Sequence, residues 1–591
     1  MAASAVRLES ARMEATIPDR PPGTVDGYRW PSRRTALGLI VFAAVLRAAT
    51  LPLRRLVEGD GVHYARLARA ILAGDFSGLA NPYWSNLWPA VIAVTSGATG
   101  LDVVAAGRAA ALVCGVLLAL LTAVLAARLF DPATGLVAGL LCAGHPWLVN
   151  FSTLVFTESF FTLLLLAVLL SAPAATVSAG GALRAGLFGG LAVVTRPEAF
   201  AAAVVVMAWI VARAAAPDRG RAARRAAVFA FVVAAFVTGR AVMVHRHFGI
   251  WDFGIGTKGT ANLLVGLAEN DREMERVTTE AAADGTNALA ARAQETSIVE
   301  FARTHPARLA RHVAHNLRRL AGSTSHVFPP LPPDNGPPRL DRGAAGVLLA
   351  ALALAAAALA ASGLWEAVRS AASRRYAALV AAVGIFYLSG LALLFVHDRL
   401  VVPLVPLFLV FLSAGIVTAG RRWFGREDIV RRLVAAGCAL LGVFCLTRML
   451  QSAPLDYARD PVVQRVTGEW LAAHYDQDTR LMTAAPLVGF YFYDAAHADQ
   501  EETLPWADCD RVVAIARQSE VSVLAVPEWH LRAVDHPAAA ALLHPETPRA
   551  DLRHVVTLGD DVVGRMFVYE VVRRTDRTSH VPPLVQTEAP Q

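Results

Sequence analysis

The chain has 591 residues, of which 55% are hydrophobic and 17% are charged, whereas an average soluble domain carries roughly 25% charged residues. Long apolar runs recur through most of the sequence, which excludes a string of soluble domains and predicts a polytopic α-helical membrane protein. The formal net charge of +7 comes from arginines clustered between these runs, so it indicates membrane orientation and excludes a basic face for nucleic acid.

The N-terminal region predicts a tail followed by a first membrane span. Residues 1–33 are polar and contain prolines, and we expect a disordered cytoplasmic tail there. Arg33 and Arg34 precede an apolar run from about Thr35 to Leu51. An arginine pair in this position is also typical of a twin-arginine export signal, but many runs follow and no small-residue cleavage site is evident, which favours a retained span.

About eleven crossings are predicted, several of them shorter than the ~20 residues of a straight span. After the first, the runs cover residues 103–127, 135–150, 153–171, 184–195, 198–213, 226–245, 343–362, 376–396, 400–419 and 433–449. If every run crosses, the arginine clusters all lie on one side, which the positive-inside rule makes cytoplasmic. We therefore expect a transmembrane domain over 34–449, with outer loops at 52–102 and 246–342.

The least certain point of this topology is the pair of runs at 184–195 and 198–213. Only Arg196 and Pro197 separate them. Proline within a helical pattern can kink a helix as well as end it, so one long kinked helix is the alternative. Losing one crossing would invert the sidedness of one part of the chain.

Beyond residue 450 the pattern changes from apolar runs to alternating short elements. A helix-like stretch from Val462 to Tyr475 is followed by strand-like runs at 511–515, 521–526 and 562–572. This predicts a small extracytoplasmic α/β domain over 450–575. The last residues, 576–591, have no periodic pattern and are expected to be disordered.

The first outer loop carries a candidate catalytic acid. Asp60 lies between two glycines and directly precedes a short amphipathic helix whose apolar residues include Tyr64 and Ala68. A helix of this kind suits the membrane interface, which places Asp60 at the edge of the membrane. An aspartate before a helix is equally typical of an N-cap, so the sequence leaves both roles open.

Two further charged residues stand at predicted outer ends of apolar runs. Glu158 lies near the start of the run at 153–171, where an unpaired carboxylate is costly, although it could simply complement a helix dipole. Arg399 opposes the positive-inside trend, and its planar guanidinium suits phosphate oxygens. The alternatives for Arg399 are an interfacial anchor or an ion pair with Asp398.

Lys258, the only lysine of the chain, lies in a glycine-rich segment at 254–259 of the second outer loop. The glycines match G-x-G-x-x-G, but a dinucleotide fold needs a strand before them and a βαβ unit around them, and here a membrane span precedes them. We reject a nucleotide site. A glycine-rich loop with one cation can still contact a phosphate, and a solvated loop is as well supported.

The order of four short motifs along residues 35–450 is more informative than any one of them. They are Asp60 with the Tyr64/Ala68 helix, the Pro146–Glu158 segment, Thr195-Arg196-Pro197-Glu198, and Arg399 with Pro403 and Pro406. This order resembles the GT-C membrane glycosyltransferases, above all the bacterial relatives of the protein O-mannosyltransferases and the lipid A aminoarabinose transferase. The C-terminal domain is also similar to one found in some such bacterial proteins.

The resemblance implies an inverting transfer of a sugar from a polyprenyl-phosphate donor to a hydroxyl of a glycan, lipid or protein acceptor. By match to the first-loop motif, Asp60 would be the general base. Many family members have Asp-Glu there, whereas this chain has Gly61, so a second acid or metal ligand is missing. Glu58 or Glu158 could compensate, and we count Glu158 as a catalytic candidate.

The leaving phosphate requires nearby cations. Arg399 is the first candidate, and Arg196 is equally well explained as a helix-break residue. The remaining candidates for substrate binding are Lys258, His397, His63 and Tyr64. A divalent cation is a candidate cofactor, but no cysteine or histidine spacing typical of a zinc site is present.

Two other function classes compete with a transferase. A transporter or a flippase for lipid-linked glycans would share the spans, but should carry ionisable groups near the midplane and often repeated halves. A sensor anchored by its membrane part would not need eleven spans. The composition, rich in alanine and arginine and nearly devoid of lysine, indicates a GC-rich bacterial genome. We therefore expect a multi-pass transferase in the bacterial cytoplasmic membrane, with its active site on the outer face.

Overall fold

The computed structural model describes most of residues 33–572. Outside the described part lie residues 1–32, 55, 58, 81–83, 214–217, 254–255, 268–272, 274–275, 278–297, 328–343, 372, 425–431, 435, 438–460, 498–499, 561–563 and 573–591. The predicted terminal tails, most of the apolar run at 433–449 and the candidate Glu58 therefore fall outside it.

Within the described residues, six helical segments are long and apolar enough to cross a membrane. They are α5 (Val103–Leu129), α8 (Glu158–Ala175), α11 (Arg219–Phe248), α17 (Ala344–Arg369), α18 (Arg374–Leu393) and the segment Arg399–Trp423, which contains most of α20 (Val405–Phe424). Shorter apolar helices are α4 (Leu87–Thr99), α6 (Pro132–Gly144), α9 (Ala179–Thr195) and α10 (Ala199–Ala212). Helix α2 (Arg33–Thr50) has 18 residues and begins with the arginine pair. The predicted helical class is confirmed, and the count of eleven crossings stays a prediction.

Local sequence signals explain where several of these helices begin and end. Asp102 caps α5 by accepting hydrogen bonds from two backbone amides, and Asp131 caps α6 by accepting one from the amide of Thr134. The run predicted at 135–150 is broken at His145, because Pro146 starts the separate short helix α7 (Pro146–Phe151). The next helix, α8, begins only at Glu158, five residues later than the pattern predicted.

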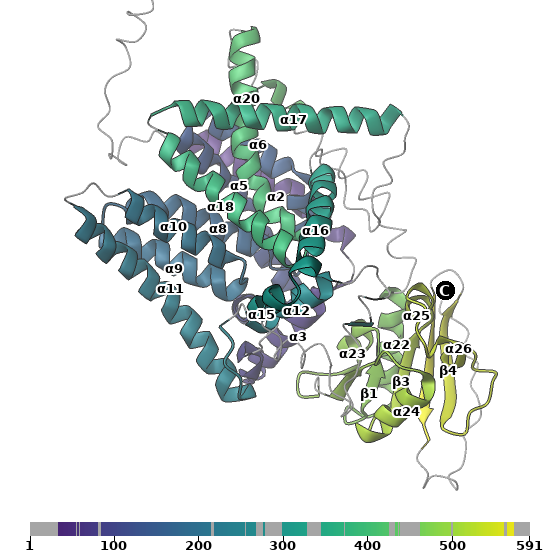
Figure 1. Ribbon diagram of the computed structural model, residues 1–591. Helices are drawn as coiled ribbons and strands as arrows, with labels where there is room; N and C mark the ends of the chain where they lie inside the picture. Colours follow the sequence, from purple (N-terminus) through teal and green to yellow (C-terminus); the bar gives the residue numbers. More distant parts are fainter. Residues whose placement is uncertain are drawn as a thin grey trace, which may run out of the picture.

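The break at Arg196-Pro197 separates two helices, so the alternative of one long kinked helix is wrong. Arg196 has an extended backbone, with φ −149° and ψ 128°, as expected for a residue before proline. Helix α9 packs against α8 and α11, whereas α10 packs against α18 and α11 (Figure 1). The polar side chain of Arg196 is thus held at a junction of helices.

The centre of the bundle is formed by α5, α8 and α20, which share one large apolar core. Helix α17 crosses α20 at a steep angle (Figure 1). Gly363 and Gly415 lie at this crossing, where an added Cβ would approach a backbone oxygen of the other helix to 2.0 Å at either position. Exposed side chains such as Phe231, Leu354 and Ile385 lie on the outside of the bundle, as expected for surfaces facing lipid.

The candidate outer loops contain short helices. The first loop forms α3 (Asp60–Leu72) and α4, and the second contributes α12 (Gly256–Gly266), α15 (Ile298–Thr304) and α16 (Pro306–Val327). The apolar face of α3 is covered by protein, because Val62, Ala65 and Ala68 pack with residues of α4 and α5. Helix α3 is therefore part of a packed layer, and its position at the membrane interface stays a prediction.

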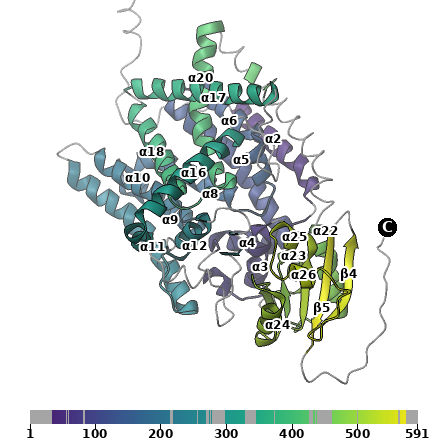
Figure 2. The same ribbon diagram turned by 45° about the vertical axis from the view of Figure 1, so that its right-hand side comes forward.

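A small α/β domain follows, with a five-stranded sheet in the order β2-β1-β3-β5-β4 (Figure 2). The strands are β1 (Leu481–Thr483), β2 (Glu501–Thr503), β3 (Val523–Pro527), β4 (Leu552–Asp560) and β5 (Gly564–Val571), parallel for β2-β1-β3 and antiparallel beyond. The helices are α22 (Pro461–His474), α23 (Pro486–Phe492), α24 (Cys509–Gln518), α25 (Glu528–Ala533) and α26 (Ala539–Leu542).

Three of the elements predicted for this domain are confirmed, namely α22, β3 and β5. The strand predicted at 511–515 is wrong, because these residues lie in α24. Asp508 caps that helix, and Cys509, Val512 and Ala516 fall on one buried helical face. A short run of apolar residues fits a strand and a helix face equally well, and here the cap decides.

Candidate active site

Asp60 is the first residue of α3, and its carboxylate points away from its own helix. The N-cap position is occupied by Gly59, whose φ of 49° favours glycine, and no side chain caps the helix. The Asp60 carboxylate instead accepts a hydrogen bond from Nη1 of Arg399 at 2.8 Å. The N-cap interpretation of Asp60 is therefore wrong.

Arg399 lies in the short helix α19 (Asp398–Val401), 339 residues from its partner Asp60. The two side chains are 31% and 27% exposed, so both remain open to a ligand. The guanidinium also lies over the ring of Phe156, at 6.0 Å from its centre. The side chain of Asp398, the partner considered from the sequence, lies outside the described part. His397 caps α19 through Nδ1 and is exposed.

A second ion pair joins Glu158, the first residue of α8, to Arg196 between α9 and α10. Arg196 Nη1 donates to Glu158 Oε1 at 3.0 Å, and the side chains are only 7% and 3% exposed. Arg196 Nε also lies 3.7 Å from an oxygen of Glu198, and the guanidinium faces the Phe161 ring at 5.6 Å. Arg196 is thus both a helix-break residue and the partner of a candidate acid.

Tyr64 of α3 is a buried residue near both ion pairs. Its side chain is buried and within electrostatic range of both acids and both arginines. Burial is the main cause that raises the pKa of the Tyr64 phenol, and the negative charges of Asp60 and Glu158 raise it further. The phenol therefore stays protonated at neutral pH and can donate a hydrogen bond.

His63 packs against an aromatic side chain. Its ring stacks on Trp84, with the ring centres 4.4 Å apart, and Trp84 also meets Tyr64 edge-on at 5.7 Å. Burial and the positive charge of Arg66 lower the pKa of His63 to about 4, so the imidazole is neutral at pH 7. A neutral imidazole offers one hydrogen-bond donor and one acceptor, and no charge for a phosphate.

The glycine-rich segment of the second loop is partly helical, because α12 begins at Gly256. The element described before it is helix α11, which ends at Phe248, and the described residues 249–253 form no strand. The backbone of Lys258 lies in α12, and its side chain is outside the described part. The expectation that Lys258 contacts a phosphate therefore stays a prediction.

Four contributing residues escaped the sequence reasoning. Arg240 of α11 pairs with Asp252 at 3.1 Å and donates to Asn86 at 2.7 Å, which ties the second loop to the first. An arginine inside an apolar run is itself a signal that could have identified Arg240. Tyr387, which donates to the Leu400 carbonyl at 3.2 Å beside Arg399, lay unmarked in an apolar run. Trp84 and Asn86 carried no distinguishing signal.

The acidic residues do not form a metal site in the described part of the chain. No three His, Cys, Asp or Glu side chains gather there in a way that could hold an ion. Asp60 and Glu158 each face an arginine guanidinium instead. As paired here, Asp60 and Glu158 do not form a cation site by themselves, and a divalent cation as cofactor stays a prediction.

Comparisons with known proteins establish the fold. No protein-family model and no curated protein matches the sequence. Among solved structures, the chain is similar to ArnT from Cupriavidus metallidurans bound to undecaprenyl phosphate, with a TM-score of 0.58 and 13% identity over 92% of this chain and 99% of that one. It is also similar to the archaeal oligosaccharyltransferase AglB from Archaeoglobus fulgidus in complex with an inhibitory peptide and a dolichol-phosphate, with a TM-score of 0.56 and 12% identity over 88% and 79%.

A further structure of the Archaeoglobus fulgidus oligosaccharyltransferase, in complex with Zn and sulfate, matches with a TM-score of 0.57 and 13% identity over 88% and 79% of the two chains. These neighbours are GT-C glycosyltransferases. The chain is therefore a multi-pass membrane protein with the GT-C fold, as the order of its motifs predicted.

Proposed function

We propose that this chain is an inverting glycosyltransferase that moves a sugar from a polyprenyl-phosphate donor to an acceptor hydroxyl. The reaction takes place at the outer face of the bacterial cytoplasmic membrane, where the C-terminal domain also lies. The observation that carries the proposal is the ion pair of Asp60 with Arg399. The two side chains are partly exposed and come from distant motifs. The GT-C fold and the lipid phosphates bound by two structural neighbours support it.

In this mechanism Arg399 binds the donor phosphate, and its fork of N–H groups can contact two phosphate oxygens at once. Asp60 takes the proton of the acceptor hydroxyl as its oxygen attacks the anomeric carbon. The bond from that carbon to the phosphate oxygen breaks on the opposite side, which inverts the anomeric centre. The negative charge that develops on the leaving polyprenyl phosphate is stabilised by Arg399.

Glu158 and Arg196 form the more buried part of the same active site. Because Glu158 is almost fully buried and bound to Arg196, its arrangement favours holding that arginine beside the reacting groups over direct proton transfer. Arg196 then adds a second positive charge on the side of the leaving phosphate. Tyr64, near both pairs and protonated, is suited to donate a hydrogen bond to substrate.

The test is sugar transfer from a labelled polyprenyl-phosphate-sugar pool in membranes that hold equal amounts of the wild-type chain or the Asp60→Asn variant. We expect transfer to fall about 10²- to 10⁴-fold, the usual contribution of a positioned base. The matched control is Asp131→Asn, which changes an ion pair of similar exposure with Arg421 while asparagine keeps the helix cap.

Equal transfer by wild type and Asp60→Asn would overturn the assignment of the base. If the wild-type chain transfers no sugar to any acceptor, while membrane vesicles show that it moves lipid-linked glycans across the bilayer, a flippase takes the place of the transferase.

A further inference from the structure

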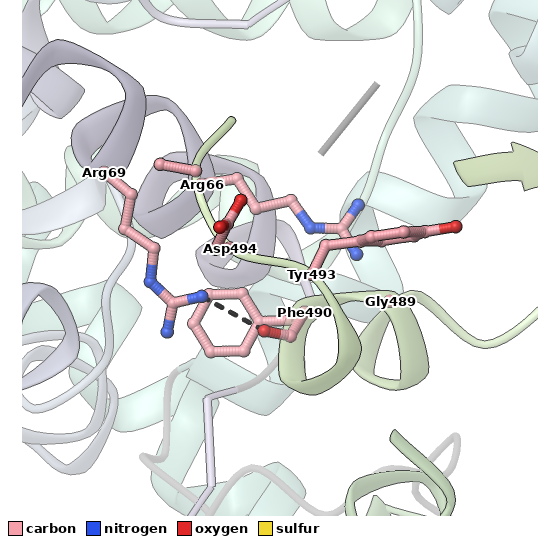
Figure 3. Close-up of a pocket in the computed structure, with 7 residues that line it drawn as sticks. Arg66, Arg69, Gly489, Phe490, Tyr493 and Asp494 are labelled. Carbon is pink, nitrogen blue, oxygen red and sulfur yellow. Dashed lines mark hydrogen bonds between the residues drawn. The ribbon is translucent and has the colours of Figure 1, made fainter. Parts of the chain in front are cut away.

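Helix α3, which carries Asp60, also contacts the C-terminal domain. Arg66 of α3 forms an ion pair with Glu501 of β2 and donates to the Pro486 carbonyl at 2.7 Å. One turn further along, Arg69 donates to the Phe490 carbonyl at 3.0 Å, and its guanidinium lies over the Phe490 ring at 3.9 Å. Figure 3 shows both arginines reaching from α3 to the α23 segment.

Apolar contacts reinforce this interface. Leu487 and Phe490 of α23 belong to the same buried cluster as Tyr64, Ala65 and Ala68 of α3. The C-terminal domain therefore packs into the core of the first loop and does more than touch its surface. Tyr64, which is near both ion pairs of the site, is part of this shared core.

Gly489 shows how closely the two parts approach. A Cβ at this position would lie 1.9 Å from Oε2 of Glu501 and 2.9 Å from Nη2 of Arg66. A larger residue at this point of α23 would force the side chains of the ion pair to shift. The side chains of Arg66 and Glu501 are 17% and 11% exposed, so the contact is mostly shielded from water.

Helix α3 also packs against α4 and α5, and the contact with α23 fixes its remaining exposed side. The helix begins after Gly59 and ends shortly before Gly74, both with positive φ. Arg66 lies six residues from Asp60, about 9 Å along the same helix axis. A shift of α3 at Arg66 is therefore transmitted to the position of the Asp60 carboxylate relative to Arg399.

We propose that Arg66 and Glu501 are positioning residues, which dock the C-terminal domain onto α3 and so hold Asp60 in reach of the substrate bound at Arg399. This inference rests on the proposed function, because it assigns the docked domain a part in catalysis. If the C-terminal domain had no part in positioning α3, breaking the ion pair of Arg66 with Glu501 would leave the position of Asp60 unchanged.

The first experiment measures kcat and KM for the lipid donor in Arg66→Glu, Glu501→Arg and the variant with both changes, using the full-length protein. We expect each single reversal to lower kcat at least about tenfold, with KM changed less than about twofold. The double reversal restores the pair in the opposite sense and should return kcat to within about threefold of wild type. The control Arg532→Glu breaks an ion pair within α25 and leaves kcat unchanged.

The second experiment reports on position without requiring transfer. Asp60→Cys is introduced into the wild-type, single and double backgrounds, and its reaction with a water-soluble maleimide is timed. We expect the labelling rate to change at least about threefold in the single reversals and to return in the double. Cys114, Cys142 and Cys509 are buried, and a parallel measurement without Asp60→Cys gives the background.

Unchanged kcat and labelling in the single reversals would overturn the inference, as would a double reversal no better than either single. If the wild-type chain transfers sugar but the charge reversals change neither kcat nor the labelling rate, only this inference fails. If no transfer occurs but labelling follows the ion pair, the positioning of Asp60 stands and the proposed function fails.

Discussion

Breaking the buried pair of Glu158 and Arg196 should cost far more stability than breaking the half-exposed pair of Asp60 and Arg399. Arg196→Met removes the cation and leaves a carboxylate that is 3% exposed without its partner. Such an uncompensated buried charge typically costs about 3–5 kcal/mol. In Arg399→Met the partner Asp60 is 27% exposed and can be hydrated, so after allowance for solvent the cost should be about 1 kcal/mol or less.

The assay is unfolding of the purified variants in detergent, followed by a reporter of tertiary structure as denaturant is added. A third variant, Glu158→Gln with Arg196→Met, removes both charges and should recover much of the stability lost in Arg196→Met. This reasoning is refuted if Arg196→Met is as stable as Arg399→Met, or if the double variant is no more stable than the single one. The pair would then be solvated in the folded protein.

Two further predictions concern the first loop and the helix crossing. The folded-state pKa of His63 is about 4 against an ordinary 6.5, so its contribution, at most about 3 kcal/mol, is present above pH 6.5 and lost as the pH falls towards 4. His63→Phe keeps an aromatic ring stacked on Trp84 but removes the titrating group. Between pH 6.5 and 4, the melting temperature of this variant should fall less than that of wild type. Parallel plots of melting temperature against pH would contradict this prediction. Gly415→Ala should destabilise the protein by about 1–3 kcal/mol in denaturant unfolding, because its Cβ would lie 2.0 Å from the Leu359 oxygen. Gly384→Ala, with no atom within 4 Å of its Cβ, should be neutral or slightly stabilising, and equal effects of the two changes would argue against a tight crossing.

The sequence was sufficient for features that depend on neighbouring residues. Apolar runs predicted the helical membrane part, and Pro197 marked the end of a helix because it restricts the residue before it. Asp60, Glu158 and Arg399 were identified as candidates because charges at the ends of apolar runs need partners or water. In the C-terminal domain the strong patterns of α22, β3 and β5 were also sufficient.

The tertiary structure decided which groups meet. The sequence left open whether Asp60 caps a helix or acts as a catalytic acid. Only the packing of distant elements brings its carboxylate to Arg399. The pairing of Arg66 with Glu501 joins residues 435 positions apart and could not be read from either segment. Periodicity and helix ends are set by local backbone geometry, whereas the partner of a side chain is set by how whole elements pack, and that information is spread along the entire chain.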